Sequence, residues 1–219
     1  MKSPKIVRQF SLHNYKHSMW KVTMEVSAFF VFALIASVTP GPSNVVLTTV
    51  GAQVGVLRGM PALIGTALGT GLILFVVGFG LGATILENHV VLMVLRIVGM
   101  GAILWLAWMI ATAPVSAETA NQEGEMRFGF LPAMLLQWVN PKAWIVSVSI
   151  VGTFMAVEGS GFEQAAELSL VFILAACIGC FPWLASGAAL RALLQHPTIA
   201  RLFNIALGLG LAAPMITLI

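Results

Sequence analysis

Long stretches without a charged side chain are the feature of this sequence that most restricts its fold. Five stretches contain no Asp, Glu, Lys or Arg: 26–57, 59–86, 97–117, 168–190 and 202–219. Charged residues make up only 9% of the chain, whereas a soluble domain carries roughly 25%. A helix needs about 20 mostly apolar residues to cross a hydrocarbon core of ~30 Å. The pattern therefore indicates a polytopic membrane protein and excludes collagen-like, disordered and nucleic-acid-binding classes.

The apolar runs predict six membrane-spanning helices with short connections. Only helices and closed barrels satisfy their backbone groups in lipid, and these runs lack the alternation of barrel strands. We therefore expect an all-α integral membrane protein. The expected spans are 26–50, 60–81, 90–112, 128–154, 168–190 and 199–219.

The first 23 residues differ from the rest of the chain because they are basic. From Met24 onward, eight glutamates outnumber six Lys and Arg residues, so the overall net charge of +3 comes from the tail. We interpret 1–23 as a basic N-terminal extension, and we favour a translation start at Met24. The alternative is a signal peptide cleaved near Ala36. We expect 24–219 to form a single transmembrane domain.

The charged loops leave the orientation of the chain open. Positive residues favour cytoplasmic loops, and four of them follow spans 1, 3 and 5, whereas spans 2 and 4 are followed only by Arg96. This count places both termini outside. Adding the five positive residues of the tail reverses the result.

The two halves of the chain resemble each other. The segment 38–51 (VTPGPSNVVLTTVG) corresponds to 139–152 (VNPKAWIVSVSIVG) at an offset of 101 residues. We therefore expect two three-helix repeats, at about 24–112 and 128–219. Because three is odd, the second repeat would be inverted relative to the first, as in many secondary transporters.

The repeated segments contain prolines that break helices 1 and 4. A proline lacks the N–H that would bond the carbonyl four residues earlier, and such breaks survive in lipid only inside protein or around a wet cavity. The half-helices that follow have N-termini suited to a carboxylate. A simple kink is the alternative, but neighbouring polar residues favour a substrate path. The predicted substrate path comprises Thr39, Pro40, Gly41, Pro42, Asn44, Gln137, Asn140, Pro141 and Lys142.

Lys142 is the strongest single candidate. It lies near the middle of the fourth expected span, about 20 Å from either end at 1.5 Å per residue, so its side chain cannot easily reach the membrane surface. No expected span interior holds a carboxylate to pair with it. Three possibilities remain: its partners are the carbonyls of Ala36, Val38 and Gln137 that the prolines free, its partner is the carboxylate of a substrate, or the lysine is neutral. The alternative is an inert lysine in a water-filled vestibule.

Other motifs carry weaker signals. Cys177 and Cys180 have a redox spacing, but in an apolar helix cysteine usually acts as a small hydrophobe. The glycines of the second span predict close helix packing. The sequence contains no metal cluster, nucleotide-binding loop or catalytic triad, and we expect neither cofactor nor enzymatic activity.

The motif TPGPSN at 39–44, the glycine-rich second span and the motif NPKAW at 140–144 together resemble the lysine exporter (LysE/RhtB) family. The resemblance covers essentially 24–219. It implies a six-helix protein of the bacterial inner membrane that exports amino acids, driven by protons. The stretch 105–112 is most similar to the branch that exports cysteine and O-acetylserine.

Two departures from that family bear on the substrate. Ser43 replaces a usual asparagine, and Thr70 follows Gly69 where many members carry an aspartate. Loss of that carboxylate weakens the case for a cationic substrate and removes an obvious proton carrier.

The sequence thus predicts a proton-coupled exporter of a zwitterionic amino acid, with the bilayer as its surroundings. A membrane thiol–disulfide carrier using Cys177 and Cys180 is the alternative, and a structural subunit of a larger complex is a third. A homo-oligomer is compatible with the sequence, which names neither the substrate nor the coupling ion.

Overall fold

The computed structural model describes residues 26–81, 89–113, 129–155 and 161–216, and all its regular elements are helices. The first described helix is Val26–Val38. It is followed by α2 Pro42–Val76, the π-helical turn η1 Val77–Leu81, α4 His89–Ala111, α5 Phe130–Val139, α6 Pro141–Phe154, α7 Gly161–Leu190, η3 Leu193–Gln195 and α8 Pro197–Ile216. The all-α prediction is confirmed for these residues. The basic extension 1–23 lies outside them.

Two helical segments are long and apolar enough to cross a membrane, namely Pro42–Gly80 and Gly161–Leu190. The remaining helices are shorter but apolar, and each of the six expected spans falls largely on helix. The inverted repeat and the count of six crossings stay predictions.

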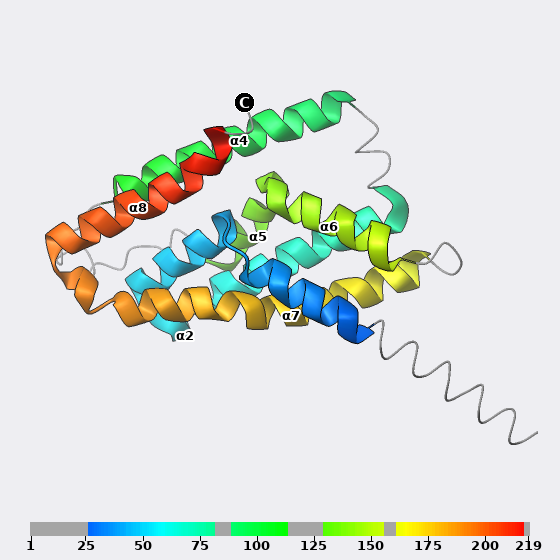
Figure 1. The fold of residues 1–219 in the computed structure, drawn as a ribbon, viewed down its shortest axis with the longest axis horizontal. Coiled ribbons are helices and arrows are strands. Elements are labelled where there is room, and N and C mark those ends of the chain that lie inside the picture. Colours follow the sequence, from blue (N-terminus) through cyan, green and yellow to red (C-terminus); the bar gives the residue numbers. More distant parts are fainter. Residues whose placement is uncertain (1–25, 82–88, 114–128, 156–160, 217–219) are drawn as a thin grey trace, which may run out of the picture.

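The α2 helix turns back on itself at Gly55, where the backbone has φ 80° and ψ 180°. Left-handed backbone of this kind favours glycine because it has no Cβ. Val50 and Gly59 would lie about 13 Å apart in a straight helix. Instead, a Cβ added at Gly59 would meet Val50 Cγ1 at 3.1 Å. The helix therefore has a first arm, 42–54, and a second arm, 56–76, which run in nearly opposite directions (Figure 1).

The α7 helix lies close against the first arm. A Cβ added at Gly51 would meet the Leu184 carbonyl oxygen at 2.0 Å, and one added at Gly187 would meet the Thr48 carbonyl oxygen at 2.0 Å. Further along, Gly179 contacts the backbone of Val26–Val38 at Leu34. Helices approach this closely only where small residues replace side chains. Thus α7 contacts both helices that flank the break at 39–41.

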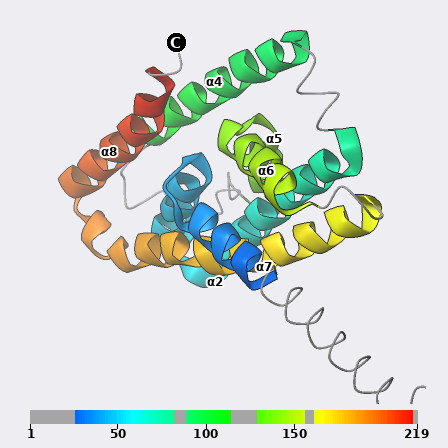
Figure 2. The same cartoon turned by 45° about the vertical axis from the view of Figure 1, so that its right-hand side comes forward.

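The remaining helices lie on one side of α2 and α7 (Figures 1 and 2). The α4 and α8 helices run side by side along one edge, where Gly208 lies against the Ala107 carbonyl. The second arm of α2 contacts α5, because Gly65 and Gly69 lie against the backbone of Phe130 and Met134. The short α5 and α6 helices are therefore held near the middle of the fold.

Large apolar side chains cover much of the outer surface of the described residues. Trp105 and Trp108 on α4 are 65% and 70% exposed, and Leu170, Leu174 and Ile178 expose one face of α7. A soluble monomer rarely exposes such contiguous apolar surface. The arrangement fits a protein whose surroundings are lipid.

Candidate functional site: a polar cavity between two helix breaks

Two interruptions of helix meet near the middle of the fold. The first covers 39–41, between Val38 and the start of α2 at Pro42, and the second is Asn140, between α5 and α6. Both following helices begin with proline, whose fixed φ suits the first helical position and whose missing N–H is no loss there. The breaks thus occur where the sequence predicts them.

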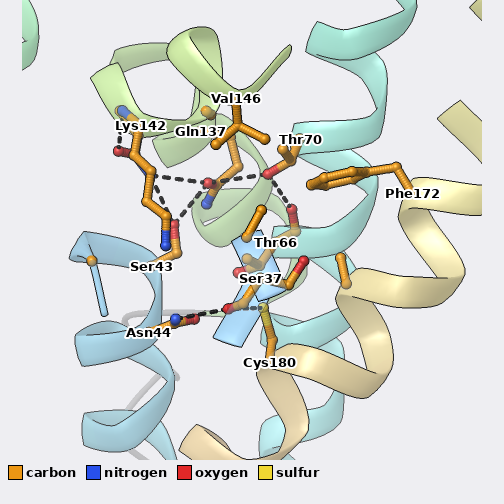
Figure 3. A pocket seen from close by; sticks show the side chains of 15 residues that line it. Ser37, Ser43, Asn44, Thr66, Thr70, Gln137, Lys142, Val146, Phe172 and Cys180 are labelled. Atoms are coloured by element: carbon orange, nitrogen blue, oxygen red, sulfur yellow. Dashed lines mark hydrogen bonds between the residues drawn. The ribbon is translucent and has the colours of Figure 1, made fainter. Parts of the chain in front are cut away.

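A hydrogen-bonded cluster joins the two breaks (Figure 3). Ser43 on α2 donates to Gln137 Oε1 at 2.8 Å, and Asn140 Nδ2 donates to Ser43 Oγ at 2.9 Å. Thr70 on the second arm also approaches Gln137 Oε1, at 3.4 Å. The side-chain oxygen of Gln137, next to the second break, therefore accepts hydrogen bonds from Ser43 beside the first break and from Thr70 on the second arm.

Side chains also hold the first break in place. Asn44 Nδ2 donates to the carbonyls of Ser37 and Thr39, at 2.9 and 2.8 Å. The indole of Trp183 on α7 donates to the Val38 carbonyl at 3.0 Å. These carbonyls would otherwise be unsatisfied at the helix end. Asn44 and Trp183 therefore stabilise the interruption.

Lys142 connects the second break to the first. Its backbone N–H donates to Asn140 Oδ1 at 3.1 Å, and its ammonium Nζ donates to the Thr39 carbonyl. A Cβ added at Gly41 would lie 2.9 Å from Lys142 Cδ, so the glycine leaves room for the lysine stem. The charged end of Lys142 therefore lies at the first break, within reach of the cavity.

The cavity at this junction has a volume of about 40 Å³, room for about three water molecules. The carboxylates of the described residues belong to Glu163 and Glu167, in the first turns of α7, and neither lines the cavity. In the described part of the chain, Lys142 is thus the one basic residue that lines the cavity.

The structure brings most of the predicted path residues together. Gly41, Asn44, Gln137, Asn140 and Lys142 line the cavity. Thr39 contributes its carbonyl, and Pro40, Pro42 and Pro141 shape the breaks.

The three carbonyls that the prolines were predicted to free differ in their hydrogen bonding. Those of Val38 and Gln137 accept hydrogen bonds from Trp183 and from the Asn140 backbone, whereas Ala36 lines the cavity. The predicted path lacks several other residues that line the cavity: Ser37, Ser43, Thr66, Thr70, Phe172 and Cys180. The spacing of Thr66 and Thr70, four residues apart on one face of an apolar helix, was the available signal.

We expect Asn140→Leu to destabilise the protein by about 2 kcal/mol or more, because α6 loses its cap and Ser43 and Gln137 lose a buried partner. Asn140 is 2% exposed. Thermal unfolding in detergent checks this. The control Gln53→Leu changes an exposed amide in α2 and should stay within about 0.5 kcal/mol of the parent. Equal stability of the two variants would contradict a capping role for Asn140.

Apolar helices that break at prolines and meet across a polar cavity define a class, because membrane transporters build their binding sites in this way. A sequence model of the LysE-type translocator family matches residues 34–218. The chain belongs to this family, whose members are transporters and not enzymes.

Several curated proteins are similar over most of the chain. The proteins of Salmonella choleraesuis (strain SC-B67) and Salmonella typhimurium (strain LT2) are each 28% identical over 187 residues, which cover 85% of this chain and 93% of theirs. That of Escherichia coli (strain K12) is 25% identical over 185 residues, covering 84% and 92%. All three are named cysteine/O-acetylserine efflux protein. No protein of solved structure matches the chain.

The thiol–disulfide alternative receives no support. Cys177 and Cys180 are both free thiols on α7, and Cys180 is buried with its Sγ 3.8 Å from the Ser37 carbonyl oxygen. The family is one of translocators.

Proposed function

We propose that this protein is a secondary exporter of zwitterionic amino acids or close derivatives, coupled to protons, in the bacterial inner membrane. The observation that carries the proposal is Lys142, whose ammonium connects two helix breaks in a cavity lined by no described carboxylate. The names of the similar Salmonella and Escherichia proteins support efflux of small amino acids.

The substrate carboxylate would bind where Lys142 now contacts Thr39. The ammonium has three donors, so it can turn from the Thr39 carbonyl to an anionic ligand, with which it forms a stronger, charge-assisted hydrogen bond. The N-terminus of α6 begins one residue earlier and adds a favourable dipole. The carboxylate thus meets positive charge from a side chain and from a helix.

The substrate ammonium would bind acceptors on the other side of the cavity. Gln137 Oε1 already accepts from Ser43, Thr70 and Asn140 and has no vacant lone pair, but Pro40 leaves the carbonyl of Ala36, a lining residue, without its usual helical donor. A basic amino acid would bring a second positive charge with no described carboxylate to receive it. Amino acids with uncharged side chains are therefore the favoured substrates.

Transport requires the cavity to change size. Its volume of about 40 Å³ holds about three water molecules, whereas even the smallest amino acid has five heavy atoms. The two breaks must therefore separate to admit substrate. We infer six spans in two inverted halves, about 24–112 and 128–219, which rock against each other around the breaks.

Metabolite profiling of the growth medium tests this function. Cells that overproduce the protein should release one or more zwitterionic amino acids, such as cysteine or O-acetylserine, above the level of cells with an empty vector. Purified protein in liposomes should then move the same compound faster when a proton gradient is imposed. An unchanged medium, together with no flux in liposomes for any amino acid, would overturn the proposal.

A further inference from the structure

Two buried serines in the described helices have no hydrogen-bond partner. Ser147 on α6 is 0% exposed and Ser169 on α7 is 6% exposed, yet neither hydroxyl has a partner. In contrast, Ser37, Thr48 and Thr70 donate to the carbonyl four residues earlier. A buried hydroxyl without a partner destabilises a folded protein, so these two positions need an explanation.

Both serines lie directly beyond the cavity. Ser147 shares the buried face of α6 with Ala143, which lines the cavity one turn earlier, and with Ile150 one turn later. Ser169 precedes Phe172, another lining residue, by three residues on the buried face of α7. Residues three or four apart lie on one helix face. The serines therefore continue the inner faces of α6 and α7 past the end of the cavity.

An apolar cluster borders the cavity at this end. It contains Phe29, Leu74, Ile150 and Phe172, all at most 3% exposed. Figure 3 shows the Phe172 ring extending from α7 toward Thr70. Phe172 thus belongs both to the wall of the cavity and to the cluster. Phe154 packs against the same cluster and lies 5.1 Å from Phe29 between ring centroids.

We propose that the substrate passes this apolar cluster beside Phe172, and that Ser147 and Ser169 form a second polar site for a zwitterionic amino acid on the path. The inference rests on the proposed function and extends it beyond the central cavity. Hydroxyls can donate to a carboxylate and accept from an ammonium, so the pair suits either end of such a substrate. When the cluster opens, water and substrate provide the partners that both hydroxyls lack in the closed structure.

Alanine variants give the first test. In Ser147→Ala and Ser169→Ala we expect efflux to fall about fivefold, the factor that one net hydrogen bond contributes. The melting temperature should stay equal or rise, because each change removes an unsatisfied buried hydroxyl. Ser149→Ala is the matched control, since Ser149 is exposed on α6 and its hydroxyl donates to Ile145. Parental efflux in both variants would overturn the inference.

Chemical labelling gives a second test that needs no efflux measurement. A variant lacking Cys177 and Cys180 is the background for Ser147→Cys, Ser169→Cys and the control Ser149→Cys. A small charged thiol reagent, applied to membranes, should label the first two variants, because a water-filled path would bring the reagent to them. It should not label the third, because the reagent does not enter lipid.

The outcomes separate the two proposals. Labelling of Ser149→Cys alone, or of none of the three variants, would show that the path lies elsewhere. A parent that exports nothing while both serine positions are labelled would refute the export function and leave the path intact. If the parent exports while both serine positions stay unlabelled, the export function stands and the proposed path past the serines is wrong.

Discussion

Replacement of Lys142 by alanine is expected to abolish efflux, a loss of about 100-fold or more, while the protein still inserts in the membrane. The change removes the one basic side chain that lines the cavity among the described residues. Charge-assisted hydrogen bonds in a site shielded from water have effects of this size. The stability should change little, because the Lys142 ammonium contacts a carbonyl and no described carboxylate depends on it.

Matched variants separate charge from shape at this position. Lys142→Met keeps the stem that packs beside Gly41 but removes the charge, and it should be as inactive as Lys142→Ala. Arg191→Ala removes an exposed charge after α7 and should export normally. Efflux from loaded liposomes, with thermal unfolding of each purified variant, makes the comparison. Parental rates in Lys142→Ala would exclude the lysine from substrate binding.

The sequence was informative about the breaks because proline acts locally. A missing N–H removes a hydrogen bond from any helix, and Pro40, Pro42 and Pro141 mark both interruptions, although Pro61 and Pro182 lie inside α2 and α7 without ending them. The midspan position of Lys142 likewise predicted a role at the centre, and the structure brings it to the first break.

The rest of the cavity wall depends on which helix faces meet. Thr66 and Thr70 belong to an apolar helix, and the Thr70 hydroxyl donates to the Thr66 carbonyl. Such a hydrogen bond within one helix is common anywhere in a membrane protein. Phe172 and Cys180 look like packing residues until α7 is placed beside the first break. Tertiary contacts of this kind leave no local signal in one sequence.

The glycines of the second span were predicted to allow close helix packing, and the structure confirms this for some of them only. In the second arm of α2, Gly65, Gly69 and Gly71 lie against neighbouring helices as predicted, whereas Gly80 has no neighbour and adopts φ 99°. There the glycine permits a left-handed backbone and not close packing. Gly82 lies outside the described residues. The reversal at Gly55 falls between the first two expected spans, 26–50 and 60–81, where the sequence predicts a short connection.

Gly187→Ala should cause a large loss of stability. A Cβ at Gly187 would meet the Thr48 carbonyl oxygen at 2.0 Å and the Ala52 nitrogen at 3.0 Å. Both are backbone atoms, so a side-chain rotation cannot relieve the clash, and α7 must move away from the first arm of α2. Overpacking of a well-packed core costs about 1–3 kcal/mol, and we expect the upper end here.

The same displacement should also impair transport, because α7 carries Trp183, whose indole holds the Val38 carbonyl at the first break. Gly101→Ala is the control, since a Cβ added there has no neighbour within 4 Å, and alanine favours a helix over glycine by about 1 kcal/mol. Thermal unfolding should therefore show Gly187→Ala melting well below the parent and Gly101→Ala at or above it. If both variants melted together, contact between α7 and the first arm would not be what holds the broken helix in place, and the side chains of Asn44 and Trp183 would have to do so alone.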